Sequence, residues 1–219
     1  MLYAVRSGSF DTVRFCLTLG ADPNDFMVDW DDYGNSPLTL ASASPEKSHI
    51  ASLLVEYGAA VSVANDYGTT PLHLAAKRVD VDLLRVLLAK NSSSEFLDAT
   101  KGNKERALYA AIEGTSCGVA EDQALEFVSA LLDAGAEANG TDYQDSAMPV
   151  AVYFDCGAIL KLLLNREPES PRKTEYLNKA LVDAIEVEAR DVIGILVEAG
   201  ASVDNEELRD ALNIGAWIG

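Results

Sequence analysis

The chain has 219 residues and a formal net charge of −18, from 35 acidic and 17 basic side chains. This charge argues against nucleic acids and anionic membrane surfaces as partners, because Lys and Arg contacts with phosphate supply most of that affinity. It fits either a partner with a basic surface or a protein kept soluble by its charge.

A unit of about 33 residues recurs along the whole chain. Its clearest copy begins Asp66-Tyr67-Gly68-Thr69-Thr70-Pro71-Leu72-His73-Leu74-Ala75-Ala76 and ends in the apolar run Val86-Leu87-Leu88. The counterparts of Pro71 lie at steps of 34, 36, 40 and 33 residues, and they are Pro37, Ala107, Ala147 and Ala180. A second anchor closes each unit, at Gly20, Gly58, Asn91, Gly135, Glu167 and Gly200. A fixed period of this length predicts a solenoid whose units bury their apolar faces against one another.

In chain order, Met1 falls inside the first helix of a unit, and residues 5–11 fit the turn that leads to a second helix. Ser36-Pro37 and Thr70-Pro71 each predict a helix start, because the hydroxyl can cap the helix and proline suits its first position. Ser44-Pro45 predicts the start of a second helix in the same way. Glycine at the end of a unit permits the left-handed turn that closes a helix.

These motifs resemble the ankyrin repeat. Thr70-Pro71-Leu72-His73-Leu74-Ala75-Ala76 matches the signature run of that family, and Leu53-Leu54-Val55-Glu56-Tyr57-Gly58-Ala59 matches the end of its second helix. The resemblance implies an all-α solenoid of helix–turn–helix units with β-hairpin fingers and a concave face that binds proteins. It also implies that His73 bridges the Thr70 hydroxyl and a neighbouring loop.

We interpret residues 1–219 as one ankyrin-repeat domain without a linker. It would comprise a half unit at 1–31, five full units at about 32–65, 66–101, 102–141, 142–174 and 175–205, and a half unit at 206–219. The fourth full unit is closed by Glu167-Pro168 where other units have glycine, which predicts an irregular end to that unit after its second helix. An insertion near residues 113–120 lengthens the third unit and is interpreted as a tolerated loop.

The hairpin position of the repeat carries a recurring tyrosine after an acidic residue. The tyrosines are Tyr33, Tyr67, Tyr143 and Tyr176, and the acids before them are Asp32, Asp66, Asp142 and Glu175. Tyrosine suits a partner contact because it offers a large ring, few rotatable bonds and a polar tip. The alternative is that each ring packs on the neighbouring hairpin while the acid closes the turn.

The first long loop is a second candidate contact. The interval from Gly20 to Pro37 is 17 residues, against 13 from Gly58 to Pro71, and the added residues include Phe26 and Trp30. A tryptophan on a protruding finger is a natural interface anchor. The alternative is that both rings cover the exposed edge of the first half unit.

Enzyme chemistry is not indicated. The chain has two histidines, neither near a nucleophile, and it lacks both a glycine run for phosphate and a Cys/His spacing for metal. We therefore expect no catalysis, cofactor or metal. The chain also lacks a run of 18 apolar residues, so we expect no membrane-spanning helix.

We predict a non-catalytic, monomeric protein-interaction module whose contacts centre on Phe26, Trp30, Tyr33, Asp66, Tyr67, Asp142, Tyr143 and Tyr176. Two alternatives stay open: a regulatory or targeting ankyrin segment of a larger multidomain enzyme or receptor, and a purely structural spacer. The cysteines are Cys16, Cys117 and Cys156. Their odd number and wide spacing fit reduced thiols in an intracellular protein, cytoplasmic or nuclear.

Overall fold

A computed structural model describes residues 1–25, 33–102, 105–117, 120–138, 143, 146–166 and 171–202. Within these residues the α-helices occur mostly as consecutive pairs. The pairs are α1 (Leu2–Ser7) with α2 (Phe10–Thr18), α3 (Pro37–Ser42) with α4 (Ser48–Glu56), α5 (Pro71–Lys77) with α6 (Val81–Leu88), α8 (Ala107–Glu113) with α9 (Glu121–Asp133), α10 (Ala147–Tyr153) with α11 (Gly157–Arg166), and α12 (Pro171–Glu186) with α13 (Arg190–Glu198). The shorter elements are 3₁₀ turns at Pro45–Lys47 and Gly114–Cys117, helix α7 (Ser94–Leu97), and strands β1 (Thr100–Lys101) and β2 (Glu105–Arg106).

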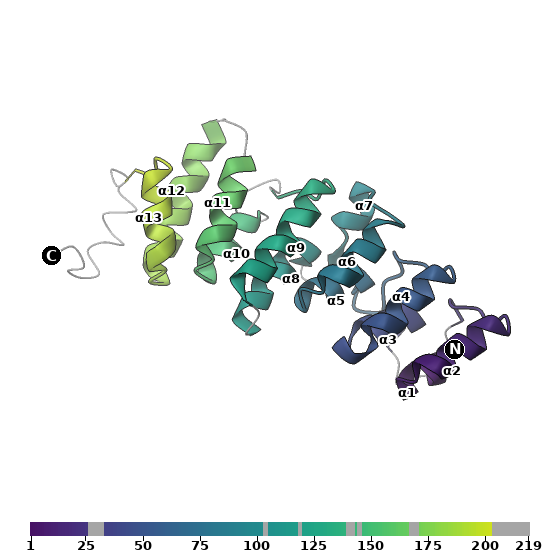
Figure 1. Ribbon diagram of the computed structural model, residues 1–219. Coiled ribbons are helices and arrows are strands. Elements are labelled where there is room, and N and C mark those ends of the chain that lie inside the picture. The colour runs from purple at the N-terminus through teal and green to yellow at the C-terminus, as the bar shows by residue number, and fades with distance from the viewer. Residues whose placement is uncertain are drawn as a thin grey trace.

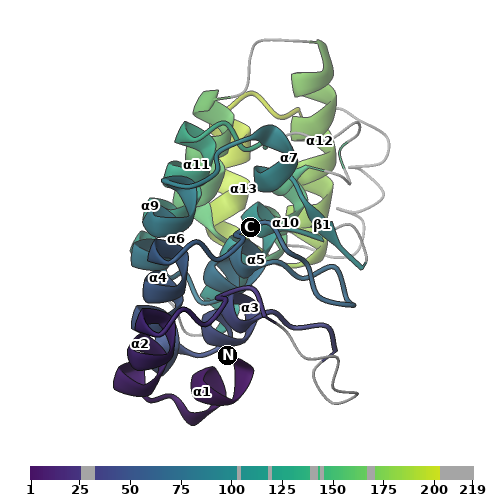
Figure 2. The same ribbon diagram turned by 90° about the vertical axis from the view of Figure 1, so that its right-hand side faces the viewer.

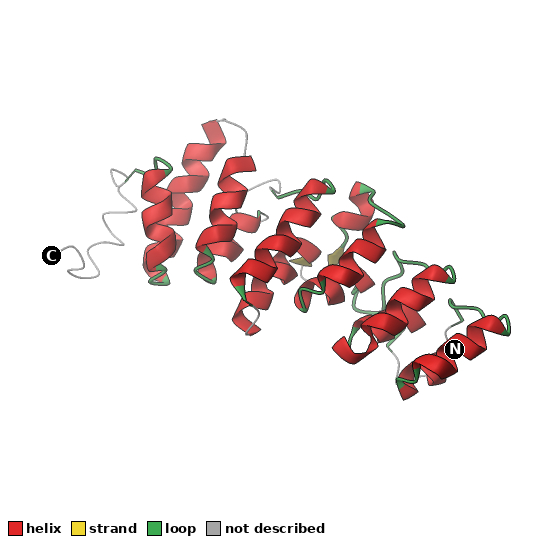
Figure 3. Cartoon of the chain, in the orientation of Figure 1, coloured by secondary structure: helices red, strands yellow, loops and turns green. Residues whose placement is uncertain are grey.

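The helix pairs stack in a row, with α1 at one end and α13 at the other (Figure 1). The second helices of the pairs form one layer, and the first helices form a layer beside it (Figure 2). The connection between α4 and α5 and the hairpin of β1 and β2 project beyond the first helices on the side away from the second helices (Figure 2). Helices account for most of the described chain, and the antiparallel ladder of β1 and β2 pairs Thr100 with Arg106 and Lys101 with Glu105 (Figure 3).

Helices α3, α5, α8 and α10 begin at the anchors that the sequence predicts. Ser36 caps α3 by accepting a hydrogen bond from the Thr39 N–H at 3.1 Å, and Thr70 and His73 cap α5 reciprocally. Pro37 and Pro71 occupy the first helical position, where an N–H would have no intrahelical partner. These caps fix where α3 and α5 start, and thereby the position of the tip that precedes each of them.

The core runs through the stack as one continuous cluster. Large side chains such as Ile50, Leu54, Leu83 and Phe127 are fully buried between helices. Burying each contributes on the order of 1.5–3 kcal/mol relative to exposure. Alanines at the helix contacts, Ala75 among them, are also fully buried, and their small size lets neighbouring first helices pack closely.

Helix α12 departs from the repeat pattern. It begins at Pro171, nine residues before the anchor Ala180, and it crosses the predicted boundary between residues 174 and 175. Tyr176 therefore lies on a helix, and the prediction that it lies at a hairpin edge is wrong. The reason is local: residues 172–186 contain neither Gly nor Pro, and Tyr176, Leu177, Ala180 and Ala184 are buried at helical spacing.

The start of α4 also differs from the expectation. Ser44-Pro45 begins a 3₁₀ turn, and α4 itself begins at Ser48. The Ser44 hydroxyl donates to the Glu46 carboxylate, and it makes no cap bond to the backbone of the turn. Without that cap the α-helical bonding starts three residues later than the sequence indicates.

Candidate protein-binding surface

Two exposed tyrosines from adjacent units lie side by side at the hairpin tips. The ring centroids of Tyr33 and Tyr67 are 5.5 Å apart with a 41° tilt, and the residues are 55% and 59% exposed. The Asp66 N–H donates to the Tyr33 carbonyl at 3.0 Å, which joins the two tips through the backbone. The sequence placed these tyrosines at one repeat position, and the structure brings them into contact while leaving both reachable by a partner.

The tip that carries Tyr67 is held by Asn65. Its Oδ1 accepts from the N–H groups of Tyr67 at 3.1 Å and Thr69 at 2.9 Å. Its Nδ2 donates to the Asn35 Oδ1 at 3.0 Å, so the same side chain also ties the tip to the preceding unit. A side chain that bonds its own turn in this way holds the loop in one conformation, which lowers the entropy lost on binding.

Gly68 completes that turn for a steric reason. It has φ of 75°, and a Cβ at this position would lie 3.2 Å from the Lys101 Cα of the next unit. Only glycine combines the left-handed conformation with this close approach at no cost. The tip of Tyr67 is therefore supported on one side by Asn35 and on the other by the hairpin of β1 and β2.

Asp66 lies between the two tyrosines in sequence and at the surface in space. Its carboxylate approaches Gly34, whose φ is 69°, so a larger residue at position 34 would be strained and would displace the Asp66 side chain. Among the ion pairs of the described residues, none involves Asp66. The tip thus presents two aromatic rings beside an acid that remains available to a cation.

Tyr143 and Tyr176 have a different environment. They are 2% and 6% exposed, and their rings meet edge to face with centroids 5.6 Å apart. The Tyr143 hydroxyl donates to the Asp183 Oδ2 at 2.7 Å, and burial, with this bond, raises the pKa of Tyr143. Both rings are packed inside the fold, but the element beside Tyr143 is helix α12 and not a hairpin, and burial takes both rings out of reach of a partner that binds the folded chain. Phe26, Trp30 and Asp142 lie outside the described residues.

His73 holds two units together. Its Nδ1 accepts from the Thr70 N–H at 3.3 Å, which leaves Nε2 as the protonated nitrogen that donates to the Glu105 carbonyl at 3.1 Å. The Thr70 hydroxyl lies 2.8 Å from the same Nδ1. Burial lowers the pKa of His73, because the charged imidazolium would be desolvated here. The expected bridge between Thr70 and a neighbouring loop is confirmed.

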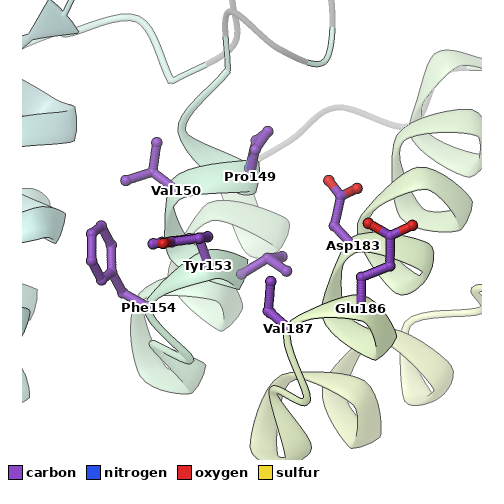
Figure 4. Close-up of a pocket in the computed structure, with 8 residues that line it drawn as sticks. Pro149, Val150, Tyr153, Phe154, Asp183, Glu186 and Val187 are labelled. Carbon is purple, nitrogen blue, oxygen red and sulfur yellow. The ribbon is translucent and has the colours of Figure 1, made fainter.

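Sequence reasoning missed a pocket between α10 and α12. Its lining includes Val150, Tyr153, Phe154, Asp183 and Glu186. Figure 4 shows the two carboxylates beside each other on α12, across from the aromatic pair on α10. A signal was present in the repeat, since Tyr153 and Phe154 occupy the positions of two basic residues, Lys77 and Arg78, in the clearest copy.

Reactive groups are few in the part of the chain that the structure describes. No cluster of three or more His, Cys, Asp or Glu side chains there could hold a metal ion. Cys156 is buried beside the Thr115 hydroxyl at 3.2 Å, and burial raises the pKa of its thiol, which disfavours the reactive thiolate. None of the described helices is both long enough and apolar enough to cross a bilayer.

Comparison with known proteins agrees with this architecture. Residues 43–142 match the family model for ankyrin repeats in three copies. A stretch of 76 residues, 34% of this chain, is 41% identical to the human ankyrin repeat and SOCS box protein 16, and it spans 16% of that protein's length. The crystal structure of the human ASB11 ankyrin repeat domain superposes with a TM-score of 0.71 over 99% of this chain and 91% of that one, at 18% identity. At this identity the likeness concerns the fold alone.

Proposed function

The chain has the ankyrin-repeat fold and its residues 43–142 match that family, and on this premise we propose that it binds a partner protein through its hairpin tips and the concave face of its first helices. Ankyrin repeats generally bind proteins and are typically non-catalytic. The observation that carries the proposal is the Tyr33–Tyr67 pair, because two rings on braced tips offer a large contact area at a small entropic cost. The proposed module acts without catalysis, as a monomer inside the cell.

The chemistry of the tips and the charge of the chain favour a basic partner surface. Asp66 adjoins the tyrosine pair, and the net charge of −18 would attract a cationic surface over a longer range. Such steering sets the association rate and partner choice more than the final affinity. We keep Phe26, Trp30 and Asp142 among the proposed contacts, on the grounds given by the sequence.

The test compares Tyr67→Ala with Tyr57→Ala in affinity capture, followed by titration of the captured partner. Tyr57 is the matched control, because it is 42% exposed but lies at the end of α4, in the second-helix layer. We expect Tyr67→Ala to weaken binding by about 1–3 kcal/mol, about fivefold to 150-fold. Tyr57→Ala should leave the affinity unchanged.

Thermal unfolding of the same variants separates a contact from a structural role. The Tyr67 ring is mostly in water, so its removal should change the melting temperature little. A loss of stability with unchanged affinity would assign Tyr67 to packing against Tyr33 and remove the basis of the proposal. Equal losses of affinity in the Tyr57 and Tyr67 variants would place the contact elsewhere.

A further inference from the structure

The pocket between α10 and α12 combines an apolar wall with a pair of acids. It has a volume of about 450 Å³, within the range of roughly 300–1,000 Å³ that is usual for ligand sites. Tyr153 is 66% exposed, and its ring meets Phe154 edge to face at 5.0 Å. Val187 is also exposed, on the α12 side (Figure 4). Tyr153 and Val187 thus leave apolar surface exposed on the two sides of one pocket, and an exposed apolar patch with a polar rim marks an interaction site.

The charges of the pocket have one sign. Asp183 and Glu186 are the ionisable lining residues apart from the Tyr153 phenol, so the described lining contains two carboxylates and no basic group. The Tyr143 hydroxyl donates to the Asp183 Oδ2 at 2.7 Å, which holds that carboxylate in place. No hydrogen bond or ion pair from another described residue engages Glu186, so its carboxylate is available to a ligand.

We propose that this pocket takes an arginine or lysine side chain of a basic peptide segment in the partner. The cationic head would lie against Asp183 and Glu186, and the methylene stem along Val150 and Val187, with the Tyr153 ring beside it. Basic side chains place an apolar stem and a charged head in this manner. The inference deepens the proposed function, on which it rests, by giving the partner a defined chemical feature.

Other ligand classes fit less well. An anion would meet two carboxylates with no cation to offset them. A wholly apolar ligand would take the Glu186 carboxylate out of water without a partner, and that desolvation is costly. Arginine suits the site better than lysine, because its planar guanidinium can bond a carboxylate and stack on an aromatic ring at once.

The probe for the test is Nα-acetyl-L-arginine amide, titrated into the ¹⁵N-labelled full chain and followed by amide chemical shifts. The matched neutral probe is Nα-acetyl-L-citrulline amide, which keeps the shape of the side chain and loses the charge. We expect saturable shifts confined to residues 150–154 and 183–187 with the arginine probe. The citrulline probe should bind at least about threefold more weakly, as expected when a partly exposed charge pair is lost.

Variants at Glu186 test the assignment within the pocket. Glu186→Gln should weaken arginine binding about threefold to fivefold, and Glu186→Lys should abolish saturable shifts. The control is Glu198→Gln, which removes the same charge from an exposed position on α13 and should have no effect. Asp183 is left intact, because its substitution would also break the bond to Tyr143.

Three results would overturn the inference: equal affinity for the two probes, shifts spread over the acidic surface without saturation, or equal effects of Glu186→Gln and Glu198→Gln. The test is independent of the hairpin tips, so Tyr67→Ala should leave arginine binding unchanged. If the arginine probe does not bind but Tyr67→Ala still weakens binding of the partner, only the proposal for the pocket is refuted. If the arginine probe binds but Tyr67→Ala does not change the affinity for the partner, only the proposed tyrosine contact is refuted.

Discussion

Replacing Arg78 with alanine should destabilise the contact between the second and third helix pairs. Arg78 follows α5, and its guanidinium donates to the Ser42 carbonyl of the preceding unit. It also donates to the Ser48 Oγ at 2.7 Å and the Asp80 Oδ2 at 2.6 Å. Asp80 in turn caps α6 by accepting from the Leu83 N–H at 3.0 Å. One side chain thus joins α3, α4 and the start of α6.

The expected cost follows from burial. The side chains of Arg78 and Asp80 are only 18% and 14% exposed, and burial lowers the pKa of Arg78 despite the opposing charge of Asp80. Breaking a fully buried ion pair costs about 3–5 kcal/mol, because the remaining charge is left without its partner. Asp80 keeps the Ser48 hydroxyl at 2.5 Å and the Leu83 N–H, so we expect Arg78→Ala to cost about 2–4 kcal/mol.

Arg85 provides the matched control. It also joins neighbouring units, through Glu126 at 2.8 Å, but its side chain is 65% exposed. An exposed pair contributes about 0–1 kcal/mol, so Arg85→Ala should cost less than about 1 kcal/mol. Urea unfolding measured at low and high salt checks both values, and salt should reduce only the Arg85 effect. Equal costs for the two variants would refute the reasoning, since burial would then not decide the strength of these ties.

Two further predictions concern the backbone and the caps. When the pH is lowered from 7.5 to 5.5, the wild type should lose more stability than His73→Gln. The pKa of His73 is lower in the folded chain than its value of about 6.5 in the unfolded chain. The contribution of neutral His73 to stability is therefore complete above about pH 6.5 and is lost as the pH falls below that value. Equal losses in urea titrations would contradict a neutral, buried His73. Glu188 is exposed with φ of 59°, so Glu188→Gly should be more stable than Glu188→Ala by about 0.5–1 kcal/mol in thermal unfolding. A less stable glycine variant would show that the left-handed turn carries no strain.

The repeat anchors predicted the starts of four first helices, two of which, α8 and α10, have no side-chain cap. Proline or alanine anchors coincide with the first residues of α3, α5, α8 and α10. The prediction failed at α12, because no Gly or Pro interrupts the helix between Pro171 and the anchor Ala180. The nearest proline is Pro171, and the helix begins there. A repeat period locates units, whereas a helix end depends on the residues that interrupt hydrogen bonding.

The candidate site was predictable only in part. The alignment of the repeats placed four tyrosines at one position. It could not show that Tyr33 and Tyr67 are exposed while Tyr143 and Tyr176 are buried. What separates them is tertiary: Tyr143 meets Asp183, which lies 40 residues away in the chain. The pocket at Tyr153 was missed for the same reason, since its other wall comes from the next unit.

The two proposed contacts lie in different units, and this makes the ties between units relevant to binding. In a solenoid each pair touches only its neighbours, so the spacing of distant contacts is the sum of local geometries. His73 and Arg78 fix the geometry between the Tyr67 tip and the units that follow and precede it. A partner that reaches both the tips and the α10–α12 pocket would depend on that spacing, because linked contacts gain affinity only when both can be engaged at once. Substitutions at Arg78 should therefore weaken such a partner without touching it, while leaving the binding of a single arginine probe to the pocket unchanged.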